Sequence, residues 1–490
     1  MNRDVHRNAG LCSAMLFGAL LPLLGAGAGT VYRQPTPVAI AKTERAADPT
    51  GTIESIRPDF VATKDNPFFQ NLGANGRTCF SCHQPDQGWT VSAQNIRSRF
   101  RVSAGLDPIF RPVDGAVCPT APTATLADKQ KAYSLLLGRG VIRIGLPIPA
   151  GGEFSVTHIN DPYKCTALRS PTAGTVSVYR RPLPATNLRL LSTVMWDGRE
   201  GFLLSPVTEP GFQPSIASDL ITQALDATTD HAEATNQPTT AQLKQIVDFE
   251  MGNTTAQIFD NAAQALNADG AAGGPQFLSK QPFYIGINDS VGLNPKPVDF
   301  TAAIFTRFDA WSGLTGDATA AARAAVARGE IVFNTKPLKM TNVNGVNDVR
   351  QKKVVDGFCG TCHDTPNGGG HSVDAPLNIG IAGAGRDAPP ALDIAGLPVF
   401  TVTCKVDTYF HPANTPFQVT DFGRAMVTGN CIDVGKIKTP TLRGLAARAP
   451  YFHNGSAATL RDVVDFYDKR FAIGFTAQEK SDLVAFLRSL

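Results

Sequence analysis

The sequence of 490 residues carries little net charge, because 45 lysines and arginines nearly balance 42 aspartates and glutamates and leave +3. A nucleic-acid-binding protein needs a basic surface, so this balance does not favour that class. Charged residues make up only 18% of the chain and apolar residues 43%, which excludes a disordered chain and a coiled coil. The length, with 45 glycines and 35 prolines, instead predicts a loop-rich folded protein of roughly two or three domains.

Long apolar runs are lacking everywhere except at the N-terminus, where residues 9–24 follow Arg3 and Arg7 and precede the small residues of 25–29. This run contains Pro22 and is shorter than the roughly 20 residues of a membrane-spanning helix. Its order of regions is typical of a secretory signal. We therefore expect residues 1–28 to be a cleaved signal peptide, and the mature chain to be a periplasmic protein with no transmembrane anchor.

Nine cysteines are present, and four of them form two C-x-x-C-H pentads at residues 79–83 and 359–363. Two thiols at this spacing match the two vinyl groups of one haem, and the adjacent histidine becomes an axial ligand of the iron. A redox dithiol does not require that histidine, and a zinc site would bring its cysteines closer together in sequence. The pentads predict two covalently bound haems c. The residues expected to hold them are Cys79, Cys82 and His83, and Cys359, Cys362 and His363.

The remaining cysteines give a second prediction. Cys12 leaves with the signal peptide, and an even number of other cysteines in an exported protein indicates two disulfides. We expect pairing within each half, Cys118 with Cys165 and Cys404 with Cys431, although three pairings are compatible with the sequence.

The pentads divide the chain into halves that we expect to be two cytochrome c-like domains, residues 40–300 and 301–490. The expected fold class is mainly α, with an irregular β-containing insertion at about 102–185 and long loops. Helical patterns cover 217–232, 240–266 and 318–333.

An amphipathic helix closes the sequence. It begins at a capping box formed by Thr476 and Glu479, and its apolar residues recur at helical spacing up to Leu490. Helices that bracket a C-x-x-C-H pentad are typical of a cytochrome c domain.

Three further segments carry a family resemblance. Residues 438–445 read KTPTLRGL, residues 449–456 read APYFHNGS, and residues 196–199 read WDGR. Together with the pentads, these segments resemble the bacterial di-haem cytochrome c peroxidase family, whose superfamily includes MauG-type enzymes that oxidise tryptophans in a partner protein. The resemblance covers most of residues 65–490 and leaves out the insertion.

The resemblance implies that the two haems do different work. The C-terminal haem is six-coordinate and stores electrons, the N-terminal haem offers an open face to peroxide, and Trp196 relays electrons between them. A tryptophan in a buried segment can also be an ordinary core residue. His158, between His83 and Trp196, falls in the insertion, and we expect it to be a surface histidine rather than a ligand that closes the N-terminal haem.

The sixth ligand of the C-terminal haem distinguishes the subtypes. Family peroxidases have a methionine at the position occupied here by Tyr467, and MauG-type members have a tyrosine. A phenolate favours ferric and higher iron states, whereas a thioether favours ferrous iron. Tyr467 is the expected ligand, with Met426 or His411 as alternatives.

Peroxide cleavage also needs a group that moves a proton from one oxygen to the other, which suits a carboxylate or an imidazole. The family places a glutamate beyond the relay tryptophan, and matching the sequences there selects Glu233, with His231 as its competitor. Both can alternatively be solvated helix residues.

The remaining expectations concern ligands and partners. The family binds a calcium ion between its domains through backbone carbonyls, for which Arg448 and Pro450 are available, with Asn187 as a rough amide candidate. The expected activity is reduction of hydrogen peroxide with electrons from a small c-type cytochrome or a cupredoxin. The alternatives are a MauG-like oxidase that acts on a protein or organic substrate, and a di-haem electron carrier without enzyme activity.

Overall fold

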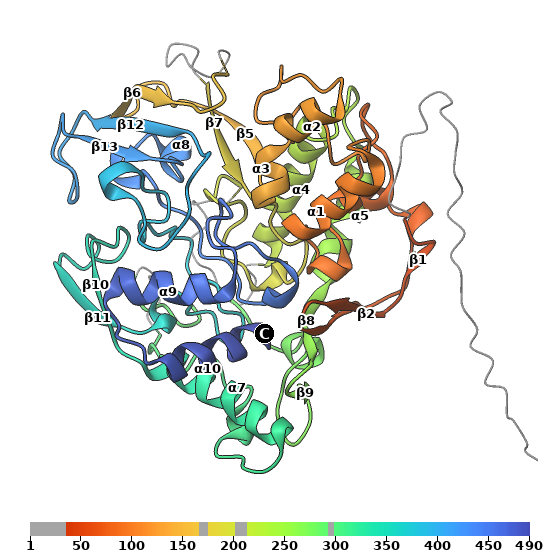
Figure 1. The fold of residues 1–490 in the computed structure, drawn as a ribbon, viewed down its shortest axis with the longest axis vertical. Coiled ribbons are helices and arrows are strands. Elements are labelled where there is room, and N and C mark those ends of the chain that lie inside the picture. The colour runs from red at the N-terminus through yellow and green to blue at the C-terminus, as the bar shows by residue number, and fades with distance from the viewer. Residues whose placement is uncertain (1–35, 166–174, 201–212, 293–297) are drawn as a thin grey trace, which may run out of the picture.

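The computed structural model describes residues 36–165, 175–200, 213–292 and 298–490 (Figure 1). The predicted signal peptide lies outside these residues. The helices are α1 (Ala93–Ser103), α2 (Leu126–Ala132), α3 (Ser134–Arg139), α4 (Gln213–Asp230), α5 (Thr240–Gly252), α6 (Pro275–Leu278), α7 (Ala318–Thr335), α8 (Ala425–Thr428), α9 (Leu460–Phe471) and α10 (Ala477–Arg488).

The strands form five small antiparallel sheets in the described residues, with the orders β1-β4, β10-β11, β13-β12-β6, β2-β3-β8-β9 and β5-β7. Their bounds are β1 (Ala39–Ile40), β2 (Thr43–Asp48), β3 (Gly51–Ile56), β4 (Val61–Ala62), β5 (Ile142–Pro147), β6 (Phe154–Asn160), β7 (Thr175–Arg180), β8 (Thr254–Asp260), β9 (Gln264–Ala265), β10 (Leu338–Thr341), β11 (Val354–Gly357), β12 (Val399–Cys404) and β13 (Pro416–Val419). Of the described residues, 31% are helical and 17% lie in strands, so the prediction of a mainly α protein is not confirmed.

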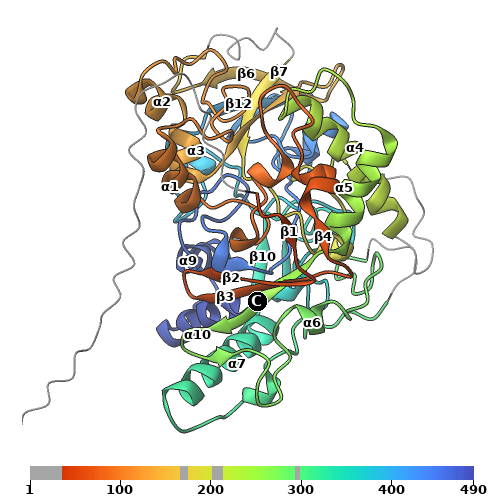
Figure 2. The ribbon, with the colours of Figure 1, turned by 90° about the vertical axis from the view of Figure 1, so that its right-hand side faces the viewer.

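The largest sheet explains part of this difference. The helix expected over 240–266 ends at Gly252, and β8 follows it and pairs with β3 from the start of the chain. The β-branched Thr254, Thr255 and Ile258 fit a pleated strand better than a helix. Gln257 N of this strand donates a hydrogen bond to the carbonyl of Leu490 at 3.4 Å, so the C-terminus lies beside the sheet (Figure 2).

The core of the C-terminal half forms where α7 and α10 cross. A Cβ atom at Gly329 of α7 would lie 2.1 Å from the carbonyl oxygen of Asp482 in α10, so this close approach requires glycine. Phe486 of α10 is fully buried, and its ring lies 5.3 Å from that of Phe305 and 5.8 Å from that of Phe333. The predicted capping box of Thr476 is present at the start of α10.

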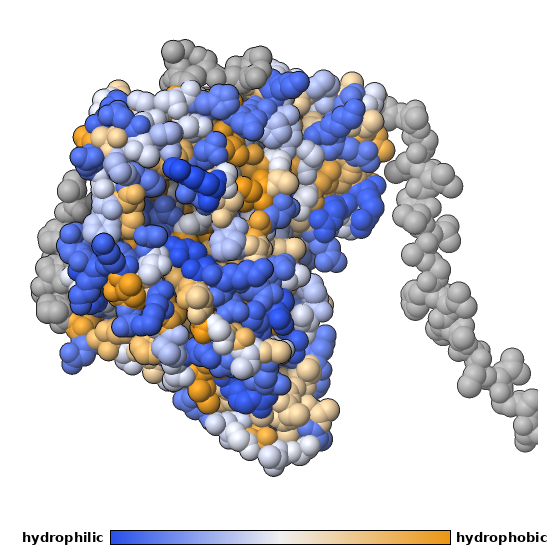
Figure 3. Space-filling model, turned by 60° about the vertical axis from the view of Figure 1, so that its left-hand side comes forward, coloured by the Kyte–Doolittle hydropathy of each residue, from blue (hydrophilic) through white to orange (hydrophobic). Residues whose placement is uncertain are grey.

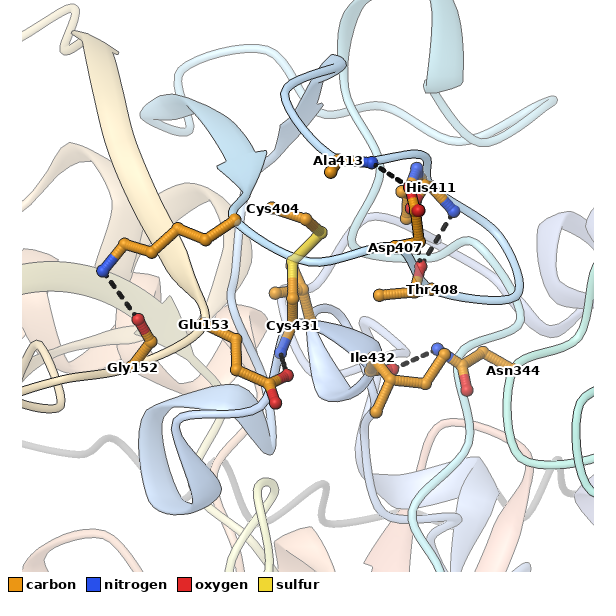
Figure 4. Close-up of a disulfide and its surroundings, with 12 residues drawn as sticks. Gly152, Glu153, Asn344, Cys404, Asp407, Thr408, His411, Ala413, Cys431 and Ile432 are labelled. Carbon is orange, nitrogen blue, oxygen red and sulfur yellow. Dashed lines mark hydrogen bonds between the residues drawn. A yellow bond between two sulfur atoms is a disulfide. The ribbon is translucent and has the colours of Figure 1, made fainter.

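The insertion in the N-terminal half pairs with the C-terminal half. Strand β6 adds to β12 and β13, and these strands lie together with α8 at the top left of Figure 1. The backbone N–H of Cys431 donates to Glu153 at 2.9 Å, and Lys405 Nζ donates to the carbonyl of Gly152 at 2.7 Å (Figure 4). The two halves of the sequence are therefore interlocked.

Both predicted disulfides are confirmed. Cys118 is bonded to Cys165, and Cys404 is bonded to Cys431 beside the contacts just described (Figure 4). Each bridge closes a loop within one half of the chain, which limits the conformations of the unfolded state.

The surface is mixed in character. On the face drawn in Figure 3, hydrophobic side chains form small groups among hydrophilic ones. Among the described residues, none of the helices combines the length and the apolar character needed to cross a bilayer.

Candidate functional site: two cavities that share a tryptophan

The first pentad lines a cavity with an empty volume of about 1580 Å³. A short 3-10 turn, Cys79–Ser81, brings Cys79, Cys82 and His83 to its wall. His83 Nδ1 lies 2.8 Å from the carbonyl of Trp89. A carbonyl only accepts, so Nδ1 carries the proton and Nε2 keeps the lone pair that a metal ligand needs. Burial lowers the pKa of His83 and keeps its imidazole neutral.

The second pentad repeats this arrangement around a cavity of about 1510 Å³. The turn Cys359–Thr361 places Cys359, Cys362 and His363 at the wall. His363 Nδ1 donates to the carbonyl of Gly369 at 2.6 Å, and burial lowers the pKa of His363 to about 4. Both histidines are therefore oriented and held neutral by the same means.

The four pentad cysteines are unpaired, whereas the four other described cysteines form disulfides. Thioether attachment to a haem needs two unpaired thiols next to an oriented histidine, and each cavity provides this set. The donor set in each cavity thus fits a c-type haem.

Trp196 belongs to the wall of both cavities. Its indole Nε1 donates to the carbonyl of Arg181 at 2.7 Å, and its ring centroid lies 6.2 Å from that of His453, which lines the second cavity. Trp196 is 9% exposed, so a buried aromatic side chain lies at the wall of both cavities and is held there by a hydrogen bond.

The two acid–base candidates lie in different environments. His231 lines the first cavity, and its Nδ1 lies 2.7 Å from Asp114 Oδ2. Burial lowers the pKa of His83, and the neighbouring His231 adds to this effect. Glu233 is exposed, does not line the cavity and accepts a hydrogen bond from Asn75 Nδ2 at 2.9 Å.

Asp114 and Arg77 line the first cavity as well and support His231 there. Arg77 Nη1 lies 2.6 Å from the Asp114 carboxylate, and both side chains are buried. Burial alone would raise the pKa of Asp114, but the charge of Arg77 and the hydrogen bonds from His231 and Arg77 together lower this pKa. An ionised carboxylate therefore orients the His231 ring.

The sequence reasoning missed one carboxyl group in the first cavity. Glu250 of α5 lines it, is 6% exposed and has no hydrogen-bond partner at Oε2 among the residues that the structure describes. Burial raises the pKa of Glu250 to about 8. In the sequence this residue looks like any polar position of an amphipathic helix, and only its distant contacts show that it is buried.

The second cavity contains the expected sixth ligand. Tyr467 of α9 lines its wall. Burial raises the pKa of its phenol, so a phenolate there needs a stabilising cation such as haem iron. His453 lines the same cavity and is fully buried; among the described residues neither ring nitrogen has a hydrogen-bond partner, although Nε2 lies 3.7 Å from Asp421.

The alternatives to Tyr467 lie elsewhere. Met426 packs in the core cluster of the β6-β12-β13 sheet, and His411 stacks on Phe417 with ring centroids 3.8 Å apart. Neither is among the residues that line the second cavity. His158 is exposed on β6 and also lies away from both cavities, whereas Met195 lines the first. The open face of the N-terminal haem therefore stays a prediction.

Three buried cations line both cavities: Arg181, Lys438 and Arg448. None of them forms an ion pair with a carboxylate among the described residues. Burial lowers the pKa of Lys438 to about 8 and that of Arg448 to about 10. Buried cations need a compensating anion or a set of oriented dipoles, and the propionates of haems bound in the two cavities would supply the anion for Lys438 and Arg448.

Known proteins resemble parts of the chain. A cytochrome-c peroxidase of Pseudomonas sp. (strain SCT) is 38% identical over 115 residues, which cover 20% of this chain and 30% of that protein. Cytochrome c551 peroxidase of Nitrosomonas europaea is 44% identical over 69 residues, 14% of this chain and 21% of that protein. The chain thus matches about a third or less of the length of these relatives, and they confirm its resemblance to cytochrome-c peroxidases.

No family model matches the sequence. A solved structure described as a MauG-like protein associated with microbial copper homeostasis aligns over 87% of this chain and 86% of its own, with 16% identity and a TM-score of 0.36.

Proposed function

We propose that the protein is a periplasmic di-haem c-type oxidoreductase that reduces hydrogen peroxide with electrons from a small redox protein. The observation that carries this proposal is the position of Trp196, which lines two cavities that each contain a C-x-x-C-H pentad. The similarity to cytochrome-c peroxidases supports it. A cytochrome c or a cupredoxin is the proposed donor.

Each cavity is proposed to hold one haem. Cys79 and Cys82 would attach the first and His83 would ligate its iron, while Cys359, Cys362 and His363 would do so for the second. Haem iron supplies the binding of peroxide and the exchange of single electrons. Residues 40–300 and 301–490 are the proposed haem domains, although β6 joins the C-terminal sheet.

The first cavity is the proposed site of peroxide reduction. The reaction takes up two electrons and two protons, H₂O₂ + 2e⁻ + 2H⁺ → 2H₂O. His231 accepts the proton of one peroxide oxygen and returns it to the other, which leaves as water. Asp114, 2.7 Å from Nδ1, orients the ring and stabilises its charged form. His231 thus takes the role that was expected of Glu233, which lies outside the cavity.

The second cavity is the proposed entry point for electrons. Apolar side chains dominate its wall, with Leu377, Ile379 and Phe471 beside Tyr467. We propose that Tyr467 is the sixth ligand there, and that Trp196 passes electrons to the first cavity. In a Tyr467→Phe variant the ferric absorption spectrum of one haem should change, and an unchanged spectrum would exclude Tyr467 as the ligand.

The position of Tyr467 also favours a second candidate function, because the resemblance associates a tyrosine there with MauG-type oxidases. Such an enzyme would take its two electrons from a protein or organic substrate. Peroxide would then react with the fully ferric protein, without a prior reduction by a cytochrome or cupredoxin.

Variants of the pentads test the proposal. We expect the purified wild-type protein to contain two haems per chain by the pyridine haemochrome assay, and a Cys79→Ala/Cys82→Ala variant to contain one. That variant should lose peroxide-dependent oxidation of a reduced cytochrome c while its remaining haem is still reducible. Full activity in the variant, or a single haem in the wild-type protein, would contradict the proposal.

A further inference from the structure

The guanidinium of Arg181 lies buried at the junction of the two halves of the chain. Its Nη2 donates to the carbonyl of Val91 at 2.7 Å and to the carbonyl of Arg448 at 3.0 Å. Its Nη1 donates to the carbonyl of Arg139 at 3.2 Å. Three backbone carbonyls from both halves therefore converge on one cation.

No carboxylate among the described residues forms an ion pair with Arg181. Burial, followed by the nearby charge of Arg448, lowers the pKa of Arg181 to about 9. A buried cation without an ionic partner is costly unless oriented dipoles replace its hydration shell. The three carbonyls supply such dipoles, as they do around a bound metal ion.

Two glycines make room for this contact. A Cβ atom at Gly140, where φ is +62°, would lie 2.4 Å from Arg181 Nη1. A Cβ atom at Gly455, where φ is +66°, would lie 2.5 Å from the carbonyl oxygen of Arg139. Both positions combine a left-handed backbone with an approach that excludes a side chain, so the site is shaped for the guanidinium.

Two of the three residues expected to bind calcium, Arg448 and Asn187, already have other hydrogen-bond partners. The carbonyl of Arg448 already accepts from Arg181. The amide of Asn187 forms two hydrogen bonds with the backbone of Thr255. Asn187 Nδ2 donates to the Thr255 carbonyl at 2.8 Å, and Asn187 Oδ1 accepts from the Thr255 N–H at 3.0 Å. Calcium takes six to eight oxygen ligands. Among the described residues, a carboxylate cluster that could supplement these oxygens is also absent.

We propose that Arg181 is a built-in cation that takes the place of the calcium ion between the two haem domains, so that the protein does not require calcium. This inference concerns the cation alone and holds whether or not the chain reduces peroxide. Arg181 also acts as a positioning residue, because its carbonyl accepts from Trp196 Nε1 at 2.7 Å and its N–H donates to the carbonyl of His453 at 2.6 Å.

Metal analysis of the wild-type holoprotein is the first test. After dialysis against a calcium buffer and gel filtration, mass spectrometry of the metals should find no stoichiometric calcium. Dialysis against EGTA should leave the haem absorption spectrum and both midpoint potentials unchanged. One calcium per chain, or a change with EGTA that added calcium reverses, would overturn the proposal.

Variants provide the second test. Arg181→Asn removes the guanidinium and leaves the carbonyls with an amide oxygen beside them. We expect it to gain saturable calcium binding with a Kd of about 10⁻⁴–10⁻³ M, the range of weak extracellular sites. Its haem spectrum should then respond to calcium, and Arg181→Lys, which keeps a cation, should show neither effect.

Arg189→Asn is the matched control. Arg189 also donates to backbone carbonyls, those of Leu278 and Gln281, but both belong to the N-terminal half. Its variant should gain no calcium response. The assignment would be contradicted if calcium did not bind to the Arg181→Asn holoprotein or change its haem spectrum, or if calcium changed the spectrum of Arg189→Asn as well. If Arg181→Asn does not fold, the metal content of the wild-type protein decides.

Discussion

Replacement of His231 by glutamine tests the assignment of the peroxide site. The substitution keeps a polar side chain at the wall of the first cavity and removes the group that can carry a proton. General acid–base catalysis contributes about 10²–10⁴-fold to a rate. At about 1.36 kcal/mol for each factor of ten, the barrier should rise by about 2.7–5.4 kcal/mol.

The surroundings of His231 give this prediction its control. Glu233 lies two residues along the chain but is exposed and bonded to Asn75. Glu233→Gln should therefore leave peroxide turnover close to that of the wild-type protein. Asp114→Asn should lower turnover, because it removes the carboxylate 2.7 Å from Nδ1. It should also destabilise the fold by about 3–5 kcal/mol, since Arg77 is then left as an unpaired buried charge.

The assay is stopped-flow loss of the reduced absorbance of a cytochrome c donor, at saturating peroxide and matched haem content. The His231→Gln and Glu233→Gln variants should each contain two haems, and their absorption spectra should show unchanged proximal coordination. If Glu233→Gln loses as much activity as His231→Gln, or if His231→Gln retains wild-type turnover, the assignment of His231 is wrong.

Three further predictions concern stability, measured by urea unfolding of the holoprotein. Arg180 Nη1 lies 2.5 Å from Asp197, and its Nε lies 2.7 Å from Asp421. Although burial opposes ionisation, Arg180 lowers the pKa of both carboxyls below their ordinary 3.8. The two carboxylates therefore stabilise the fold fully above pH 3.8, and this stabilisation is lost as the pH falls through their lower folded-state pKa values. Asp421→Asn should weaken this acid dependence, and an unchanged slope below pH 4 would count against it. Cys404→Ser/Cys431→Ser opens a loop of 27 residues and should lower the free energy of unfolding by about 3.5 kcal/mol. Opening the 47-residue loop of Cys118 and Cys165 should lower it by about 4 kcal/mol. Equal stability of the wild-type protein and these variants would refute the estimate. Gly329→Ala should cost about 1–3 kcal/mol because α10 must move away, whereas Gly138→Ala, which meets nothing within 4 Å, should be neutral or stabilising by up to about 1 kcal/mol.

Local chemistry made part of the site predictable from the sequence. Haem attachment fixes the spacing of two thiols and a histidine, so the pentads predicted residues that the structure places at cavity walls. The capping box predicted the start of α10 for a similar reason, because its hydrogen bonds join residues three apart. Trp196 and Tyr467 came from the family resemblance.

Features that depend on distant contacts were not predictable. Thr254 to Asp260 forms a strand because β3, about two hundred residues earlier, offers a pairing edge. His231 and Glu233 end on different sides of the chain because φ of Glu233 is +54°, and nothing in the sequence indicates that turn. The cations Arg181, Lys438 and Arg448 converge from segments far apart, and each looks like a surface residue when considered alone.

The most direct test of the central claim is single-turnover oxidation of the fully reduced holoprotein by one equivalent of hydrogen peroxide, without a donor and without oxygen. Peroxide takes two electrons and each ferrous haem supplies one. We predict that stopped-flow absorption shows rapid oxidation of both haems in the wild-type protein. In Trp196→Phe, one haem should be oxidised rapidly and the other slowly. Oxidation of neither haem, or equal rates for both haems in Trp196→Phe, would contradict a peroxide site in one cavity supplied through Trp196 from the other.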